Sequence, residues 1–231
     1  MRSVICPACG VTNSVRPHAA NELPICGACK SRLPPERMAP YLEKQLEQGT
    51  DTWLRWRKEG IGASDAPVVM GVSPWMSVDE LLRIKTGEAN EPQATDAMRR
   101  GKMMEDTARK AYVEHVCVAV RPACVEAVGR EWMRASLDGL ADKRQRIVEI
   151  KCPGPKDHAL ALQGQIPEHY YPQLQHILAV TGFPEIDYWS YRHDMGVLLK
   201  VPRDGRYIDR LISSEEQLWQ VITSRRSSRE K

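Results

Sequence analysis

The segment ASLDGLADKRQRIVEIKCP, residues 135–153, constrains the fold of this chain more than any other part of the sequence. Its second half, RIVEIKC, is rich in β-branched residues and alternates with the period of a β-strand. The polar run ADKRQR separates this strand from the apolar run before it, which predicts a tight antiparallel hairpin. On the second strand Ile147, Glu149 and Lys151 share one face, and the residues between them take the other.

Asp138 on the first predicted strand can lie across the hairpin from Glu149 and Lys151. An isolated acid-x-lysine pair on a strand is commonly an exposed ion pair, and that is the simpler interpretation. The alternative is a metal site, in which two carboxylates hold hard cations and the amine lies beside an attacking water. The rest of the chain has to decide between the two interpretations.

The N-terminal part of the chain has the cysteine spacing of a zinc ribbon. Two C-x-x-C pairs, CPAC and CGAC, are separated by 16 residues, and two such pairs complete a tetrahedral site. A thioredoxin-like redox site needs only one pair, placed at the start of a helix, and no helical pattern follows either pair. We therefore expect one structural Zn²⁺ in residues 1–33, with these ligands: Cys6, Cys9, Cys26 and Cys29.

Composition limits the other possibilities. The chain has 231 residues, 42% of them hydrophobic and 27% charged, as in ordinary globular proteins. The net charge of +3 is weak support for a nucleic-acid partner. Seven cysteines without a secretion signal favour a reducing compartment, and no apolar run is long enough for a membrane span. We expect a cytoplasmic protein, with no membrane partner, in a bacterial host cell and a phage context.

A proline-rich segment separates two predicted domains. LPPERMAP closes the ribbon, and we predict a linker over residues 34–45 and a larger domain over residues 46–231. Strands are predicted at 186–192 and 196–202, in addition to the hairpin. Helical patterns are predicted in chain order at 41–49, 51–60, 64–71, 77–87, 95–116, 170–182 and 212–224. Helices alternating with strands that include antiparallel hairpins indicate a mixed α/β class.

Two further polar residues lie on apolar helix faces. Glu105 shares a face with Gly101, Ala108 and Tyr112, so it points toward the core side of its helix. It can pair with a neighbouring basic residue, or a bound cation can compensate its charge. Gln173 lies on one stripe of its helix with apolar neighbours, where a satisfied core glutamine is the simpler interpretation.

Four segments together resemble a known family. In chain order they are LEQGTDTWLRWRKEGIGASDA, RRGKMMEDTAR, SLDGL with EIKCP, and YYPQLQHILAVTG. The set is similar to the lambda exonuclease family, also called YqaJ-like viral recombinases, within the PD-(D/E)XK nuclease superfamily. The resemblance covers roughly residues 46–222 and leaves the ribbon outside. It implies a restriction-endonuclease-like α/β core, with a mixed central sheet flanked by helices, plus the small N-terminal zinc ribbon.

The resemblance also implies a role for each matching residue. Asp138, Glu149, the carbonyl of Ile150 and Glu105 would bind two Mg²⁺ or Mn²⁺ ions in the active site. Lys151 would orient or deprotonate the attacking water, and Gln173 would complete the catalytic set. The remaining matches would contact DNA, with a pocket for a terminal 5′-phosphate, and they are Arg57, Ser64 and Tyr170.

The activity that the resemblance implies is a metal-dependent 5′→3′ exonuclease. Such an enzyme degrades one strand of linear double-stranded DNA, exposes 3′ single strands, and works beside a single-strand annealing protein in phage-type recombination. The family assembles as a ring-shaped homo-trimer. Two alternatives stay open: a Cas4-like or other nuclease of the same superfamily, with an iron–sulfur cluster on its cysteines, and a DNA-binding or assembly module without catalysis.

Overall fold

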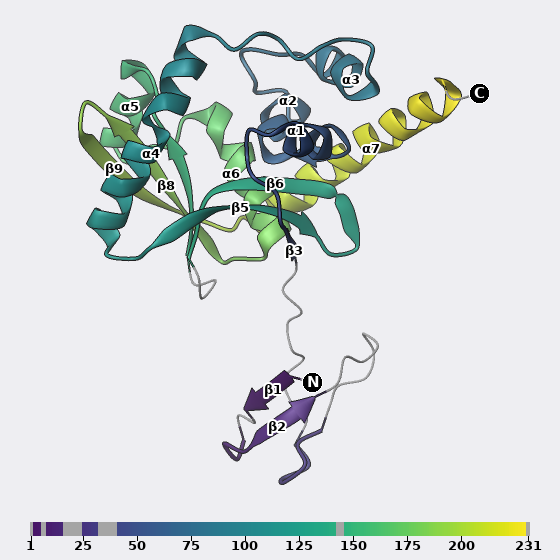
Figure 1. The fold of residues 1–231 in the computed structure, drawn as a ribbon, viewed down its shortest axis with the longest axis vertical. Coiled ribbons are helices and arrows are strands. Elements are labelled where there is room, and N and C mark those ends of the chain that lie inside the picture. Colours follow the sequence, from purple (N-terminus) through teal and green to yellow (C-terminus); the bar gives the residue numbers. More distant parts are fainter. Residues whose placement is uncertain (1, 6–7, 16–24, 32–40, 142–145, 230–231) are drawn as a thin grey trace. The chain divides into compact units, whose positions relative to one another are not determined.

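The computed structural model describes residues 2–5, 8–15, 25–31, 41–141 and 146–229. These residues belong to two compact units, Met1–Pro40 and Tyr41–Lys231, and each is described by itself. Figure 1 gives the labels of the helices and strands. Among the described residues no helix combines the length and the apolar character that a membrane span requires.

The described residues of the first unit form an antiparallel strand pair and a cysteine cluster. β1 (Arg2–Ile5) pairs with β2 (Thr12–Val15). Cys9, Cys26 and Cys29 bring their sulfur atoms within 4.8 Å of one another. The fourth predicted ligand, Cys6, lies outside the described residues.

The second unit is built on a seven-stranded mixed sheet with the order β3-β5-β6-β7-β8-β9, and β4 pairs with β6. The β7–β8 and β4–β6 pairs are parallel and the other pairs are antiparallel. The strands are β3 (Tyr41–Lys44), β4 (Ile61–Gly62), β5 (Val120–Ala127), β6 (Arg130–Ala141), β7 (Ile147–Lys151), β8 (Glu185–Arg192) and β9 (Met195–Pro202).

Helices cover both faces of this sheet. They are α1 (Asp51–Lys58), η1 (Ala63–Asp65), α2 (Ala66–Val69), α3 (Val78–Thr86), α4 (Asp96–Val116), α5 (Pro155–Leu162), η2 (Glu168–Tyr170), α6 (Tyr171–Thr181) and α7 (Gly205–Arg229). α4 packs its Ala108 and Tyr112 against Val148 and Ile150 of β7. α6 lies on the opposite face, where its side chain at 173 reaches the alternate residues of β7.

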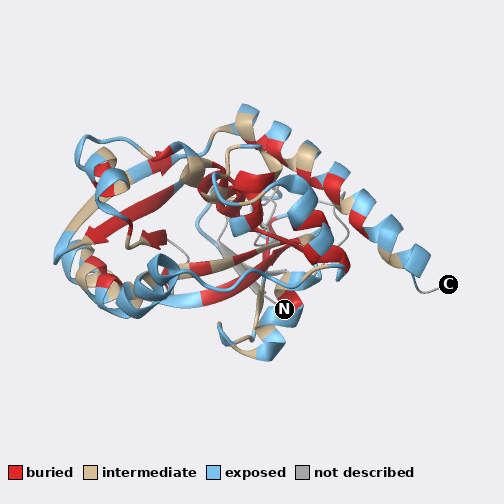
Figure 2. Cartoon of the chain, turned by 90° about the horizontal axis from the view of Figure 1, so that it is seen from above, coloured by how far each residue is buried: buried red, intermediate tan, exposed pale blue. Residues whose placement is uncertain are grey.

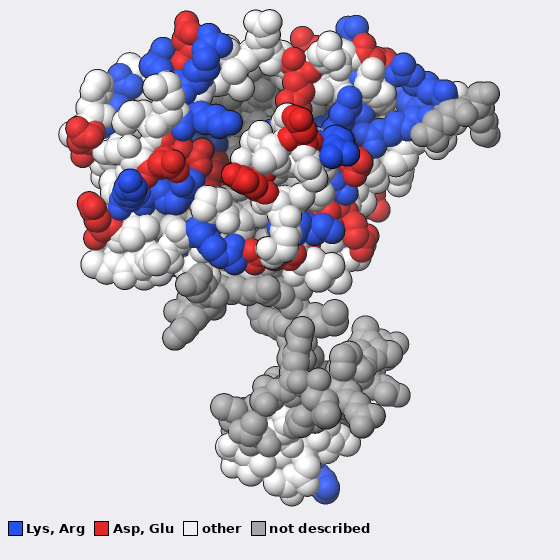
Figure 3. All heavy atoms as spheres, in the orientation of Figure 1, with Lys and Arg blue, Asp and Glu red and all other residues white. Residues whose placement is uncertain are grey.

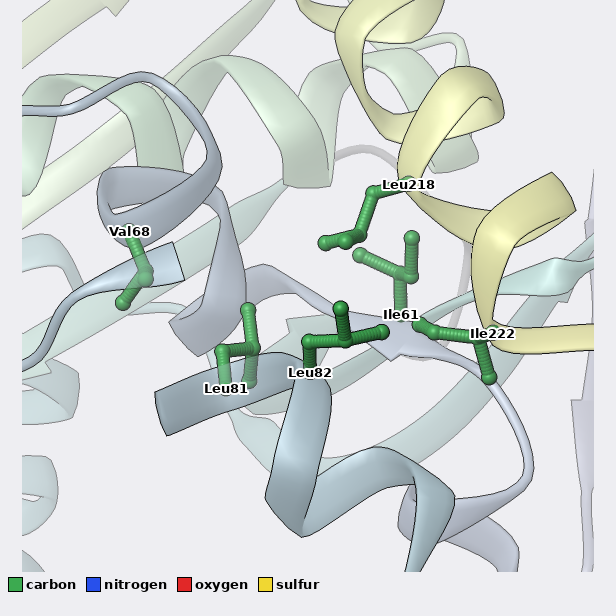
Figure 4. Packing of buried hydrophobic residues seen from close by; sticks show 6 residues of the cluster. All are labelled: Ile61, Val68, Leu81, Leu82, Leu218 and Ile222. Atoms are coloured by element: carbon green, nitrogen blue, oxygen red, sulfur yellow. The ribbon is translucent and has the colours of Figure 1, made fainter. Parts of the chain in front are cut away.

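A second core cluster holds the helices that follow β4. Ile61 is fully buried and meets Val68 of α2, Leu81 and Leu82 of α3, and two residues of α7 (Figure 4). The α7 residues of this cluster are Leu218 and Ile222. Buried residues concentrate on the central strands and inner helices, whereas the last turns of α7 are mostly exposed (Figure 2).

The structure confirms the mixed α/β class with helices on both faces of a central sheet. It also confirms the hairpin and the helix predicted at residues 77–87, which starts at a capping box. The Ser77 hydroxyl accepts from the N–H of Glu80, whose carboxylate accepts from Ser77, and Gly87 closes the helix in the left-handed region at φ 78°.

The helix predicted at residues 41–49 was wrong, and so was the assignment of residues 41–45 to a linker. Tyr41–Lys44 forms β3, which pairs with β5 and buries Tyr41 in the second unit. Partner strands far along the chain decide such short segments, so local pattern does not identify them. The helix predicted at residues 64–71 is shorter in the structure: Ser64 lies within η1, and α2 spans only Ala66–Val69.

We expect Gly196→Ala to destabilise the second unit, because a Cβ there would lie 1.9 Å from the indole of Trp189. That indole cannot move freely, since its Nε1 donates to the carbonyl of Ala108 at 3.0 Å. Overpacking of this kind costs about 1–3 kcal/mol, measurable by urea unfolding. Gly101→Ala is the matched control: nothing lies within 4 Å of its Cβ position in α4, so it should stabilise by about 0.5–1 kcal/mol. Equal effects of the two substitutions would contradict the packing at Gly196.

Candidate active site

The β6–β7 hairpin brings Asp138 to the end of β7. Gly139 pairs with Val148 across the hairpin, and the Asp138 carboxylate accepts the backbone N–H of Ile150 at 2.8 Å. This hydrogen bond fixes the Asp138 carboxylate beside the Glu149–Ile150 peptide group. The sequence prediction that Asp138 lies across from Glu149 and Lys151 is therefore met by the hairpin register.

Glu149, Lys151 and Gln173 form a closed set of hydrogen bonds. The Lys151 ammonium donates to Oε1 of Glu149 at 2.6 Å and to Oε1 of Gln173 at 3.0 Å. The Gln173 amide in turn donates from Nε2 to Oε1 of Glu149 at 2.6 Å. Each of the three groups is bonded to the other two, so α6 holds the Glu149 and Lys151 side chains of β7 in place.

The other carboxylate oxygen of Glu149 is buried and accepts no hydrogen bond from the described residues. Burial raises the pKa of Glu149, and the Lys151 ammonium opposes that rise. Burial also raises the pKa of Asp138 well above its ordinary value, and the Glu149 carboxylate adds to this. Two crowded carboxylates with an unsatisfied buried oxygen are a donor set that a hard divalent cation fits.

Glu105 approaches the same site from α4. Its carboxylate raises the pKa of both Asp138 and Glu149, as a smaller contribution than burial. The Glu105 side chain is 32% exposed and forms an ion pair with Arg109, as the simpler sequence interpretation allowed. Its charge thus acts on the site, while its hydrogen bond goes to its own helix.

Arg109 links the candidate site to α4, whereas the sequence analysis considered it only as a basic partner for Glu105. Its Nε donates to the backbone carbonyl of Asp138 at 2.8 Å, and its other nitrogens reach Glu105 and Asp106. One guanidinium therefore ties α4 to the strand that carries Asp138. The spacing of Glu105 and Arg109, one helical turn apart, signals their ion pair but not the bond to the carbonyl of Asp138.

Tyr170 lies beside the lysine of the site. The Lys151 ammonium is 5.1 Å from the centre of the Tyr170 ring, a cation–π contact. Burial raises the pKa of Tyr170, and Lys151 opposes the rise. The structure thus brings Asp138, Glu149, Lys151, Gln173 and Tyr170 together, with Glu105 at the edge of the group.

Arg57 and Ser64 form a second pair. The Arg57 guanidinium donates to the Ser64 hydroxyl at 2.8 Å and lies 4.7 Å from the centre of the Trp53 ring. Ser64 is exposed and Arg57 is half-buried. A guanidinium and a hydroxyl fixed side by side are suited to an anion such as phosphate.

A buried lysine supports the segment that carries this pair. Lys85 donates to the carbonyl of Arg57 at 3.1 Å and to that of Gly60 at 2.9 Å, and its ammonium lies 2.6 Å from Asp65. The Asp65 carboxylate also accepts the N–H of Gly62 at 2.8 Å. Burial would raise the pKa of Asp65, but the Lys85 ammonium, the N–H of Gly62 and the Arg57 guanidinium together lower it.

The face shown in Figure 3 has a hollow between α4 and the α1–α2 segment. Basic and acidic side chains gather around the rim of this hollow. A surface with both signs of charge can hold cations at one place and phosphate groups at another.

The comparison with protein families gives a match to the YqaJ-like viral recombinase domain over residues 52–184, more than half of the chain. The chain belongs to this family. The uncharacterized protein YqaJ of Bacillus subtilis strain 168 is 28% identical over 190 residues, which cover 79% of this chain and 59% of that protein. An uncharacterized protein of Acanthamoeba polyphaga mimivirus is 26% identical over 164 residues, covering 65% of this chain and 30% of that protein. The chain thus spans less than two thirds of either relative.

Solved structures share the fold of this YqaJ-like chain. The alkaline exonuclease LHK-Exo from Laribacter hongkongensis superposes with a TM-score of 0.68 at 21% identity, covering 78% of this chain and 96% of that one. A phage related exonuclease from Haemophilus somnus 129PT gives a TM-score of 0.50 at 15% identity, with 71% and 96% covered. The second unit therefore shares the fold of these exonucleases.

Removing the Lys85 ammonium should destabilise the protein at neutral pH. Lys85→Met leaves the buried carboxylate of Asp65 without its counter-charge, which costs about 3–5 kcal/mol. The wild-type pKa of Asp65 is lowered, so this pair stabilises above the ordinary aspartate pKa and the stability is lost as the pH falls through the lowered value. The deficit of the variant should therefore be largest near pH 7 and shrink in acid, as urea unfolding at several pH values will measure.

The double variant Lys85→Met with Asp65→Asn is the control for this prediction. It removes both charges, so most of the stability lost by Lys85→Met alone should return. A double variant as unstable as the single one would contradict the assignment of the loss to an unpaired Asp65.

Proposed function

We propose that this chain is a divalent-metal-dependent exonuclease that degrades one strand of linear double-stranded DNA from its 5′ end. The observation that carries the proposal is the meeting of Asp138, Glu149 and Lys151 at one point of an exonuclease fold, with a buried oxygen of Glu149 left to accept a ligand. An exposed ion pair, the simpler interpretation of the sequence, does not account for a glutamate that is only 2% exposed.

The carboxylates of Asp138, Glu149 and Glu105 and the carbonyl of Ile150 would hold Mg²⁺ or Mn²⁺, two ions in each active site. A divalent cation supplies a water of lowered pKa and stabilises negative charge on a phosphate. Lys151 would orient or deprotonate the attacking water and stabilise charge on the phosphate, and its hydrogen bond to Gln173 fixes its direction.

Arg57 and Ser64 support the choice of the 5′ end. A terminal phosphate carries more negative charge than an internal one, and the fixed guanidinium and hydroxyl are suited to receive it. Tyr170, beside Lys151, would contact the DNA near the cleaved bond. Degradation of this strand would leave a 3′ single strand for an annealing protein, in phage-type recombination within the host cytoplasm, and a ring-shaped homo-trimer would surround the duplex.

The first unit supports a separate structural zinc site on Cys6, Cys9, Cys26 and Cys29. The sulfur atoms of Cys9 and Cys26 lie 3.6 Å apart, and the N–H of Gly27 is held by Asn13 at 2.8 Å. A hydrogen bond from the backbone of Cys29 leads the set of contacts that lower the pKa of Cys26 to about 6. The thiolate is the form that binds a metal ion, so the lowered pKa of Cys26 favours metal binding. Zinc content of the purified chain, and loss of that zinc in Cys26→Ser, test this site.

Digestion of a linear duplex labelled separately at its 5′ and 3′ ends tests the activity. With Mg²⁺ we expect nucleotides to be released from the 5′-ended strand, and none with EDTA. Lys151→Ala should lower turnover on the order of 10²–10⁴-fold while duplex binding changes little, because its charge acts mainly in the transition state. Lys200→Ala, a 55% exposed lysine paired with Glu185, is the control and should cleave normally.

Three results would count against this function. Near wild-type turnover in Lys151→Ala would remove the role of the lysine. Release from the 3′-ended strand would reverse the polarity. Binding of duplex without any cleavage would favour a DNA-binding or assembly module.

Arg57→Ala tests the phosphate pair separately. We expect wild-type protein to degrade 5′-phosphorylated ends faster than 5′-hydroxyl ends. Because a charge-assisted hydrogen bond contributes about 1.5–3 kcal/mol, Arg57→Ala should slow phosphorylated ends about ten- to a hundred-fold and hardly affect hydroxyl ends. Arg55→Ala, on the same helix, is the matched control. If Arg57→Ala slows both kinds of end equally, Arg57 does not select the phosphate.

A further inference from the structure

The loop between α2 and α3 carries a tryptophan whose exposure the fold does not explain. Trp75 is 69% exposed, although burial of an aromatic ring of this size is strongly favourable. The loop holds it in place, since the N–H of Trp75 donates to the Ser73 hydroxyl at 3.3 Å. A single exposed apolar residue is ordinary on its own. The aromatic rings beside Trp75 indicate a function for its exposure.

Trp75 begins a series of aromatic contacts that ends at the candidate active site. The Trp75 and His169 rings meet edge to face at 4.8 Å, and the His169 and Tyr170 rings follow at 4.2 Å. The Tyr170 ring is 5.1 Å from the Lys151 ammonium. Bases stacked along one strand repeat every ~3.4 Å. The series therefore spans only the first few nucleotides next to the bond that Lys151 would act on.

A groove of about 410 Å³ lies beside the indole. Its one acidic lining residue, Glu80, already accepts the N–H and the hydroxyl of Ser77 in the capping box of α3. No basic residue lines this groove, so it is suited to a flat, uncharged group rather than to a phosphate. Its apolar lining comes from both sides of the loop: Val68, Pro74, Trp75, Met76 and Val78.

We propose that Trp75 is a stacking site for an unpaired nucleobase of the strand that enters the active site. The indole provides the platform and His169 fixes it relative to Tyr170 and Lys151. Stacking of this kind accepts any base, because every base has a π-face. The proposal rests on the proposed nuclease function for its direction, and it adds a contact with the base beside the contacts with metal and phosphate. The other occupant that an exposed indole could have is a second copy of the chain.

Fluorescence of 2-aminopurine tests the stacking directly and without cleavage. The probe is a duplex with a short single-stranded 5′ extension that contains this base, mixed with the full chain in EDTA. We expect wild-type protein to quench the fluorescence. Trp75→Ala should lose the quenching and bind about ten-fold more weakly, whereas Trp75→Phe should keep most of both. Leu42→Ala, which removes an exposed apolar side chain from β3, is the matched control and should behave as wild type.

Two results would overturn the stacking site. One is quenching by Trp75→Ala equal to that of wild type. The other is a smaller assembly of Trp75→Ala in light scattering with unchanged quenching, which would make Trp75 a contact between copies. Failure of the nuclease function is distinguishable: quenching by wild type without Mg²⁺-dependent cleavage would keep the stacking site and remove the exonuclease.

Discussion

The candidate site depends most on the hydrogen bonding of one buried group, the carboxylate of Glu149. A buried charge is costly unless it is paired and fully hydrogen-bonded. Lys151 and Gln173 satisfy one oxygen of Glu149, and the other accepts nothing from the described residues. The unsatisfied oxygen persists because other contacts fix the positions of β7 and α6. A buried oxygen without a hydrogen-bond donor is suited to bind a cation.

Those other contacts lie on both faces of the sheet. On one face α4 packs against Val148 and Ile150, which alternate with the polar residues of β7. On the other face α6 is tied to α7 by a fully buried pair, in which His176 lies 2.7 Å from Glu215. The second ring nitrogen of His176 lies 3.0 Å from the carbonyl of Arg134. Both ring nitrogens of His176 face oxygen atoms, whereas a neutral imidazole has only one N–H to donate. The His176–Glu215 pair therefore carries one proton more than a neutral histidine beside an ionised glutamate.

The part of the site that lies on one hairpin could be predicted from the sequence. Period-2 alternation places Glu149 and Lys151 on one face, and a short hairpin limits where Asp138 can lie. The contacts of Arg109 and Lys85 could not be predicted, because each reaches carbonyls on segments that are distant in the sequence. Strand β3 was missed for the same reason, since only its pairing with β5 makes it a strand. α5 was missed because Gly154 and Pro155, which begin it, look like breaks.

Family membership and geometry give different parts of this account. The match over residues 52–184 establishes the YqaJ-like family and the exonuclease fold, and the roles of single residues rest on their contacts. The contacts support three proposed parts of the site: a cation site on Glu149 and Asp138, a phosphate pair on Arg57 and Ser64, and an aromatic approach that ends at Tyr170.

Binding of Mn²⁺, followed by electron paramagnetic resonance in the absence of DNA, tests the central claim most directly. Glu149→Gln keeps the shape of the side chain and removes the charge and one acceptor oxygen. We predict that wild-type protein binds Mn²⁺, that Glu149→Gln loses this binding, and that Glu185→Gln, at an exposed carboxylate on β8, keeps it. Equal Mn²⁺ binding by wild type and Glu149→Gln would contradict the account.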